Sequence, residues 1–177
     1  MSDHFLVEFT RPKDSKLISN LIMKIQGSKY SHVRVKWTSS SGITLVYEAS
    51  RSSVKFVGPI SQSNHPVEVI RCYKITVSPT EFRSLIDVCI TYADVSYGTL
   101  QLIGMGLVRL FKLKKNPFGD GAKTQVCSEL LSKILERVKK WHHDMDMEIA
   151  GPKELDLFMA SKVDQGMVEL VIPKAPL

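Results

Sequence analysis

The sequence predicts an α+β protein with a mainly antiparallel sheet packed against helices. Four strand-like runs follow one another between residues 31 and 77, and four helical patterns follow between residues 78 and 160. Strands and helices are therefore partly segregated, whereas a parallel sheet requires them to alternate. The turn sequence Thr38-Ser39-Ser40-Ser41-Gly42 joins two of the strand-like runs, which indicates an antiparallel hairpin.

Each element is predicted from its own local pattern. Alternating or short apolar runs predict strands at 5–9, 31–37, 43–49, 53–57, 67–77 and 167–172. Helices are expected over 15–26, 78–93, 100–111, 126–138 and 152–160. Gly27 closes the first helix, and Ser78-Pro79-Thr80-Glu81 has the form of a capping box with proline at the first helical position.

Three of these helices have a clear apolar face. The residues expected on these faces are Leu17, Ile18, Leu21, Ile22 and Ile25 in the first helix; Leu85, Ile86, Cys89, Ile90 and Ala93 in the second; and Leu130, Leu131, Ile134, Leu135 and Val138 in the fourth.

Composition limits the class of protein. The chain has 177 residues, of which 44% are hydrophobic and 24% charged, as expected for one domain (1–177) with a real core. The formal net charge of +6 favours an anionic partner, but it equally fits a merely basic surface. The longest basic run is the short Lys112-Leu113-Lys114-Lys115, so we favour the plain surface and expect no specific nucleic-acid partner.

Cysteine usage and the apolar runs indicate a compartment. Cys72, Cys89 and Cys127 form no CxxC pair, which fits a reducing environment. Residues 1–14 lack the pattern of an export signal, and the longest apolar stretch, 100–113, is too short and too charged to span a bilayer. We therefore expect a cytoplasmic protein without a transmembrane segment.

The hairpin supplies a candidate catalytic pair. His32 and Glu48 fall on one face of it, because side chains alternate along a strand. If the turn centres on Ser40, the two residues lie directly opposite each other, and the carboxylate can then hold the imidazole in one tautomer. A register shift by one residue would separate them.

Cys127 is the candidate nucleophile. It follows a loop that contains Gly119 and Gly121, and it falls in the first turn of a predicted helix, where the helix dipole favours a thiolate. Backbone amides at the same helix start can stabilise an oxyanion. Cys89 falls on a predicted core stripe and Cys72 within a strand, so we interpret both as packing residues.

The order of these residues resembles a known family. Tyr30-Ser31-His32-Val33, Tyr47-Glu48-Ala49 and Val126-Cys127-Ser128-Glu129-Leu130-Leu131 are similar to the circularly permuted NlpC-type papain-like peptidases, in which the order is His, Glu, Cys. Tyr97-Gly98 before an apolar helix and the stretch from Gly151 to Leu155 match the same layout. The resemblance covers nearly the whole chain.

The resemblance implies a papain-like fold and a cysteine hydrolase that needs no metal or organic cofactor. Cys127 would be the nucleophile, His32 the base and Glu48 the orienting residue. Peptide amide bonds of peptidoglycan are the typical substrates, and related lecithin:retinol acyltransferase-like enzymes act on acyl lipids. Small members without export signals are common in bacteria and bacteriophages, so we expect action in the bacterial cytoplasm or delivery with a virion.

Four further residues are candidates for oxyanion or substrate contacts: Gln125, Ser128, Tyr30 and Arg34. Arg34 occupies the position after Ser-His-Val, which is often small in such proteins, and Lys36 follows it. Their charge would favour an anionic cell-wall fragment, or the two side chains would close the pocket. Val126 precedes the cysteine where an aromatic residue is frequent, and Gln125 is the substitute that we consider there.

Three functions remain open. The first is cleavage of an amide in a peptidoglycan-type peptide, and the second is hydrolysis or transfer of an acyl group from an ester or lipid with the same three residues. A hydrophobic pocket near the helix at 100–111 would favour the second. The third is a catalytically silent binding or virion-structural protein of the same fold.

Overall fold

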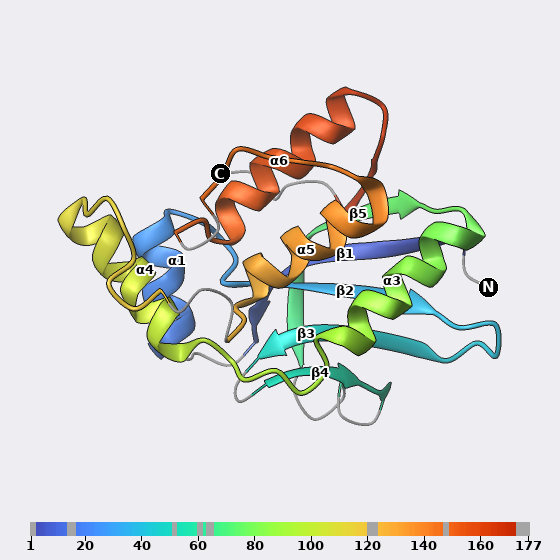
Figure 1. Cartoon of the computed structure of the whole chain (residues 1–177), viewed down its shortest axis with the longest axis horizontal. Helices are drawn as coiled ribbons and strands as arrows, with labels where there is room; N and C mark the ends of the chain where they lie inside the picture. The colour runs from blue at the N-terminus through green and yellow to red at the C-terminus, as the bar shows by residue number, and fades with distance from the viewer. Residues whose placement is uncertain are drawn as a thin grey trace.

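A six-stranded sheet forms the centre of the molecule (Figure 1). The computed structural model describes residues 3–13, 17–50, 53–59, 62, 66–119, 124–146 and 149–172. The strand order is β4-β3-β2-β1-β5-β6, and every neighbouring pair is antiparallel. The strands are β1 (His4–Pro12), β2 (His32–Thr38), β3 (Thr44–Ser50), β4 (Ser53–Val57), β5 (Val67–Thr76) and β6 (Glu169–Ile172). The expected α+β class with an antiparallel sheet is confirmed.

Five helices accompany the sheet in the described part of the chain. They are α1 (Leu17–Gln26), α3 (Pro79–Thr91), α4 (Thr99–Phe111), α5 (Cys127–Lys139) and α6 (Pro152–Asp164). Helix α5 packs on β2 and β3 and contacts both α3 and α6. Helices α1 and α4 contact each other at one end of the molecule, on the left in Figure 1. The chain is therefore divided into a sheet with covering helices and a separate pair of helices at its end.

The core lies between the sheet and the covering helices. The apolar face of α5 is buried as predicted, with Leu131, Ile134 and Leu135 almost inaccessible to solvent. Alternate residues of β2, Val33 and Val35, pack into the same cluster. Because burial of one such side chain contributes roughly 1.5–3 kcal/mol, this contact fixes α5 on the sheet and with it the position of Cys127.

Helix α3 shows both a confirmed and a corrected prediction. Ser78 and Glu81 form the predicted capping box, in which each side chain accepts a hydrogen bond from the other residue's backbone N–H. Ile90, however, is expected on the buried face and is 63% exposed. Phe82 and Val88 are buried instead, so the buried stripe is rotated relative to the prediction.

Two helix ends differ from the expected limits. Helix α6 continues to Asp164, one turn beyond the expected end at residue 160. Ser15, the expected first residue of α1, lies outside the described residues. Gly27 has the positive φ of +58° that ends α1 as predicted.

Candidate functional site

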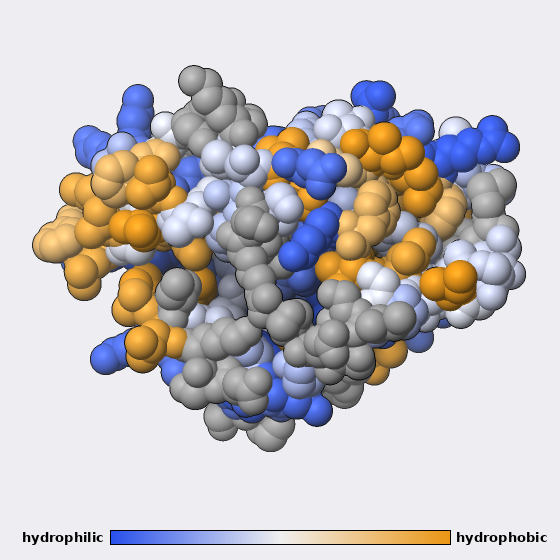
Figure 2. Space-filling view, turned by 90° about the horizontal axis from the view of Figure 1, so that it is seen from below, coloured by the Kyte–Doolittle hydropathy of each residue, from blue (hydrophilic) through white to orange (hydrophobic). Residues whose placement is uncertain are grey.

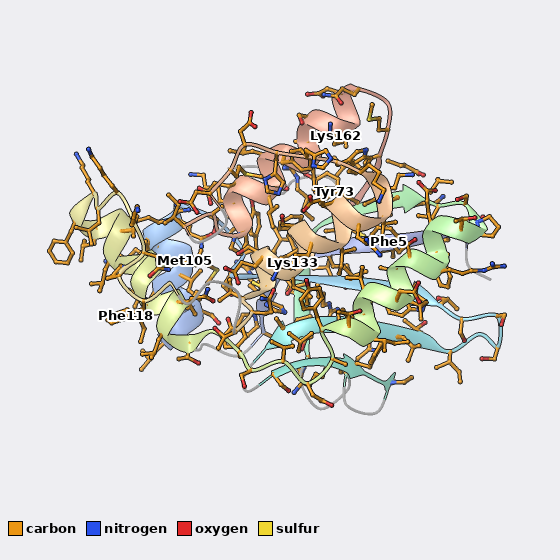
Figure 3. The ribbon with its side chains drawn as sticks, in the orientation of Figure 1. Phe5, Tyr73, Met105, Phe118, Lys133 and Lys162 are labelled. Carbon is orange, nitrogen blue, oxygen red and sulfur yellow. The ribbon has the colours of Figure 1, made fainter. Side chains whose placement is uncertain are left out.

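The candidate site lies at the end of the sheet where β2 begins and β3 ends. A cavity of about 660 Å³ opens there between the strand ends and the helix pair α1 and α4. His32, Glu48 and Tyr97 contribute to its polar wall, together with Arg34 and Lys55. The helices supply the apolar wall, which comprises Leu21, Ile22, Ile25, Leu102, Ile103, Met105, Leu107 and Leu110. Figure 3 shows Met105 on α4 next to α1.

His32 and Glu48 are in contact, although not by the expected register. The hairpin pairs Thr38 with Thr44 and Val35 with Tyr47, so the turn centres on Ser41 rather than Ser40. Glu48 is therefore diagonal to His32 instead of directly opposite. A shift of two positions keeps both residues on one face, and long side chains can bridge a diagonal pair. Nε2 of His32 lies 3.0 Å from Oε2 of Glu48.

Cys127 is the first residue of α5 and is 5% exposed. Its side chain forms a hydrogen bond with His32. Nε2 of the same ring contacts Glu48, so His32 interacts with both side chains. The first backbone N–H groups of a helix have no partner within the helix and carry the positive end of its dipole. Cys127 therefore lies beside both an imidazole and a set of amide donors.

The contacts with Cys127 and Glu48 change the pKa of His32. Burial by itself lowers the pKa of the ring, because it disfavours the charged form. The negative charge and hydrogen bond of Cys127 act in the opposite direction, as do the hydrogen bond and charge of Glu48. Together they raise the pKa of His32 to about 10. The ring is thus stabilised as an imidazolium between two groups that can be anionic.

The other two cysteines are placed differently. Cys72 and Cys89 are both buried. Burial raises the pKa of the Cys72 thiol to about 11, with a smaller contribution from Glu8, and burial also raises the pKa of Cys89. Both therefore remain neutral thiols at physiological pH, in agreement with their interpretation as packing residues.

Tyr97 is a further site residue, which the sequence indicates only as part of the Tyr97-Gly98 pair before an apolar helix. It lines the cavity, and a bridge between Tyr97 and Gln125 places it beside the start of α5. Burial and the negative charges of Cys127 and Glu48 raise the pKa of its hydroxyl, so the phenol stays protonated. A protonated hydroxyl there is a hydrogen-bond donor. No local pattern around Tyr97 predicts this proximity.

The start of α5 is tied to α4 by buried polar side chains. Glu129 accepts hydrogen bonds from Nε2 of Gln101 at 3.1 Å and from the backbone N–H of Val126 at 3.3 Å. Asn116 in turn donates to the carbonyl of Gln101 at 3.0 Å. These contacts hold the turn that carries Cys127 against α4, whose other residues form part of the cavity wall.

Two of the expected contact residues lie in the chain next to Cys127. Gln125 is fully buried, and its side chain donates to the carbonyl of Thr124 and accepts from Lys133. It does not line the cavity. Ser128 is also buried, and its Oγ has no hydrogen-bond partner among the described residues. An unpaired buried hydroxyl is costly, which makes Ser128 the more notable of the two.

The remaining two lie on the β2 side of the site. Tyr30 donates to Asp156 at 2.5 Å, inside a buried cluster that also contains Arg71 and Tyr73, and it does not line the cavity. Arg34 does line the cavity, with its guanidinium paired to Glu8 at 2.7 Å. Lys36 shares the same carboxylate at 3.1 Å, so one positive charge in this group is left uncompensated.

The fold resembles that of a solved structure over nearly its whole length. The crystal structure of the metalloprotein YiiX from Escherichia coli O157:H7 aligns with a TM-score of 0.60 and 13% identity, covering 99% of this chain and 98% of that one. At this identity the likeness establishes a YiiX-like fold. No family model matches the chain, and no curated protein matches it.

YiiX is a metalloprotein, which raises the question whether this chain has residues for a metal site. Among the described residues, no group of three or more His, Cys, Asp or Glu side chains is placed to hold a metal ion. The described residues around Cys127 therefore do not fit a metal ion. In the same part of the chain, no helix is long and apolar enough to cross a membrane.

Proposed function

We propose that this protein is a papain-like cysteine hydrolase that works through an acyl-enzyme thioester on Cys127. The observation that supports it is the position of His32, which contacts Glu48 through Nε2 and also interacts with the side chain of Cys127. A nucleophile, a base and an orienting carboxylate in contact are the arrangement required for nucleophilic acyl transfer. The YiiX-like fold and the family resemblance of the motifs agree with it.

The proposed reaction has two stages. In the first, the Cys127 thiolate attacks the carbonyl carbon of an amide or ester, and amides at the start of α5 stabilise the oxyanion. The His32 imidazolium gives its proton to the leaving nitrogen or oxygen as the carbon–heteroatom bond breaks. In the second, neutral His32 takes a proton from water, the hydroxide attacks the thioester, and the carboxylic product leaves as the sulfur regains its charge. Glu48 stabilises the imidazolium in both stages.

The residues that line the cavity indicate which classes of substrate fit it. Its polar wall and the groups paired to it carry a net positive charge, from Arg34, Lys36 and Lys55 against Glu8 and Glu48, which fits an anionic peptide of the peptidoglycan type. Its other wall is formed by apolar residues of α1 and α4, as expected for the second candidate, an acyl ester or lipid. We consider the acyl ester or lipid as strong a candidate substrate as the peptide amide, because a hydrophobic pocket near α4 favours the acyl substrate.

Turnover of both substrate classes tests the proposal. Purified protein is incubated with muropeptides and with nitrophenyl esters of acetate, octanoate and palmitate, and acid-quenched samples are searched by mass spectrometry for an acyl adduct on Cys127. We expect turnover of one class, and a loss of about 100-fold or more in Cys127→Ala and His32→Ala.

Cys72→Ala is the matched control, because it removes a buried thiol that the mechanism does not use. It should retain turnover. Equal rates for wild type and Cys127→Ala, with no adduct, would contradict the proposal and leave the catalytically silent binding or virion-structural protein.

A further inference from the structure

The positive charge of the chain is concentrated in two segments. Residues 17–31, which include α1, and residues 98–119, which include α4, contain six Lys and Arg and no Asp or Glu. This equals the formal net charge of +6 of the whole protein, so the rest of the sequence is balanced. Lys112, Lys114 and Lys115 are exposed at the end of α4, and no described carboxylate pairs with them.

The same two segments also expose most of the large apolar side chains. Of the fourteen such side chains in the described part of the chain, eight lie here. They are Leu17, Leu21, Leu100, Ile103, Leu110, Phe111, Leu113 and Phe118. Figure 2 shows apolar residues gathered at the left end of the molecule with hydrophilic residues at the margin, and Figure 3 places Phe118 at this end. A soluble surface rarely concentrates apolar residues in this way without a partner.

We propose that this surface, made of those eight apolar residues and Lys112, Lys114 and Lys115, docks on a lipid bilayer that contains anionic headgroups. We call it the α1–α4 surface. Apolar side chains that enter the boundary between headgroups and acyl chains, flanked by lysines that contact phosphates, are the pattern of interfacial membrane binding. The run from Leu110 to Lys115 alternates bulky apolar side chains with lysines at the tip of α4.

Charge decides against a second copy of the chain as the occupant. Neither segment contains a carboxylate, so two copies meeting through this surface would bring like charges together. Anionic headgroups supply the complementary charge and the apolar layer at once.

The α1–α4 surface is continuous with the cavity. Leu21, Ile103 and Leu110 are all more than half exposed, and each also lines the cavity. A bilayer in contact with these three residues would therefore lie at the cavity mouth. This docking does not depend on the chemistry proposed for Cys127.

Flotation with lipid vesicles tests the proposal. The full chain is mixed with vesicles of phosphatidylcholine alone and with vesicles in which one lipid in three is phosphatidylserine. We expect binding to the anionic vesicles that is at least about tenfold tighter and that weakens as salt is raised. Leu110→Ser with Phe111→Ser, and separately Lys112→Gln, Lys114→Gln and Lys115→Gln together, should each lower that binding at least about tenfold.

A matched triple variant controls for charge. Arg83→Gln, Arg137→Gln and Lys140→Gln together remove three exposed cations from α3 and the end of α5, and should leave binding within about twofold. Circular dichroism verifies that each variant is folded, and the salt and lipid dependence of the wild type needs no variant at all.

Three outcomes would overturn the proposal. One is wild-type binding that ignores phosphatidylserine, and another is an equal loss in the α3–α5 control. The last is a wild-type dimer in sedimentation that Leu110→Ser with Phe111→Ser dissociates, without vesicle binding, since the surface would then join two copies. Cys127→Ala should bind vesicles as the wild type does, which separates this result from any failure of the hydrolase proposal.

Discussion

Helices α5 and α1 are both amphipathic, but the apolar face of α5 is buried whereas that of α1 leaves leucines exposed to solvent. On α5, Leu131 and Leu135 are fully enclosed between the sheet and the neighbouring helices. On α1, Leu17 is 88% exposed and Leu21 more than half exposed, although the sequence pattern is as clear. Amphipathic periodicity therefore predicts that a helix forms and which face is apolar, but whether that face is covered depends on what the rest of the chain brings to it.

The polar groups of the two regions also differ in their exposure to solvent. Asp156 on α6 is 2% exposed and accepts hydrogen bonds from Tyr30, Tyr73 and Arg71, at 2.5 to 2.7 Å, beneath the covering helices. Burial, followed by the hydrogen bond to Asp156, raises the pKa of Tyr30 and keeps it a donor. Figure 3 shows Tyr73 in this region. At the α1–α4 end, by contrast, the lysines face solvent. The Asp156 cluster is stabilised by contacts within the chain, whereas the lysines at the α1–α4 end remain accessible to a partner.

The largest expected effect is on the buried cluster. Asp156→Ala leaves the Arg71 charge and the Tyr30 hydroxyl without their acceptor, and leaves Tyr73 only the backbone carbonyl of residue 156 at 3.3 Å. We therefore expect the free energy of unfolding to fall by about 3–5 kcal/mol. Urea denaturation measures it. Asp164→Ala, at the exposed end of the same helix, is the control and should change stability by less than about 0.5 kcal/mol. Similar losses for both would show that the cluster contributes little.

Truncation of matched leucines tests the comparison directly. Leu135→Ala on α5 should lower the free energy of unfolding by about 2–5 kcal/mol, because it leaves a cavity in the core. Leu17→Ala on α1 removes the same atoms from an exposed position and should cost less than about 0.5 kcal/mol. Thermal or urea unfolding of both variants gives the difference, and equal costs would mean that the α1 face is covered in solution.

The smallest effect concerns thiol reactivity. The raised pKa of His32, about 10, means that its ring keeps a positive charge beside the Cys127 sulfur at neutral pH. Iodoacetamide at pH 7 should therefore label Cys127 before Cys72 or Cys89, as read by peptide mass spectrometry. In His32→Gln the rate at pH 7 should fall about tenfold or more, with labelling rising only toward the ordinary thiol range near 8.5.

The sign of the pH dependence follows from the same charge. The advantage of the wild type over His32→Gln should be full at neutral pH and should shrink as pH rises toward about 10, where His32 loses its proton and a free thiol is ionised in any case. Equal labelling of all three cysteines at pH 7 would contradict the assigned arrangement.

The candidate site was predictable where short-range rules apply. Alternation along β2 and β3 places His32 and Glu48 on one face, and the helix start identifies Cys127 among three cysteines. The register was wrong by two positions, because the length of the turn around Ser41 follows from its own backbone hydrogen bonds, Gly42 to Ser39 and Ser39 to Ile43, which composition does not determine. His32 and Glu48 are still in contact, because a register shift of two residues keeps both side chains on the same face of the sheet.

No short-range sequence rule predicts the other parts of the site. Tyr97 is brought to Cys127 by a bridge to Gln125 between segments that are 28 residues apart in the chain. Tyr30 is a candidate substrate contact by its closeness to His32 in the sequence, but it is engaged by Asp156, 126 residues away. Such pairings depend on how helices settle on the sheet, and a single sequence holds no local signal for them.

The sequence by itself determined the α+β class, the positions of its helices and strands, and a histidine, a carboxylate and a cysteine suited to one chemistry, since these depend on periodicity, capping and residue type within short windows. The tertiary structure alone decided that the three converge, that the histidine and the carboxylate line a cavity with an apolar wall, and that the helices forming that wall leave apolar and basic side chains uncovered. Long-range packing sets these outcomes, because it depends on the distances between segments far apart in the chain and not on the pattern within any one of them.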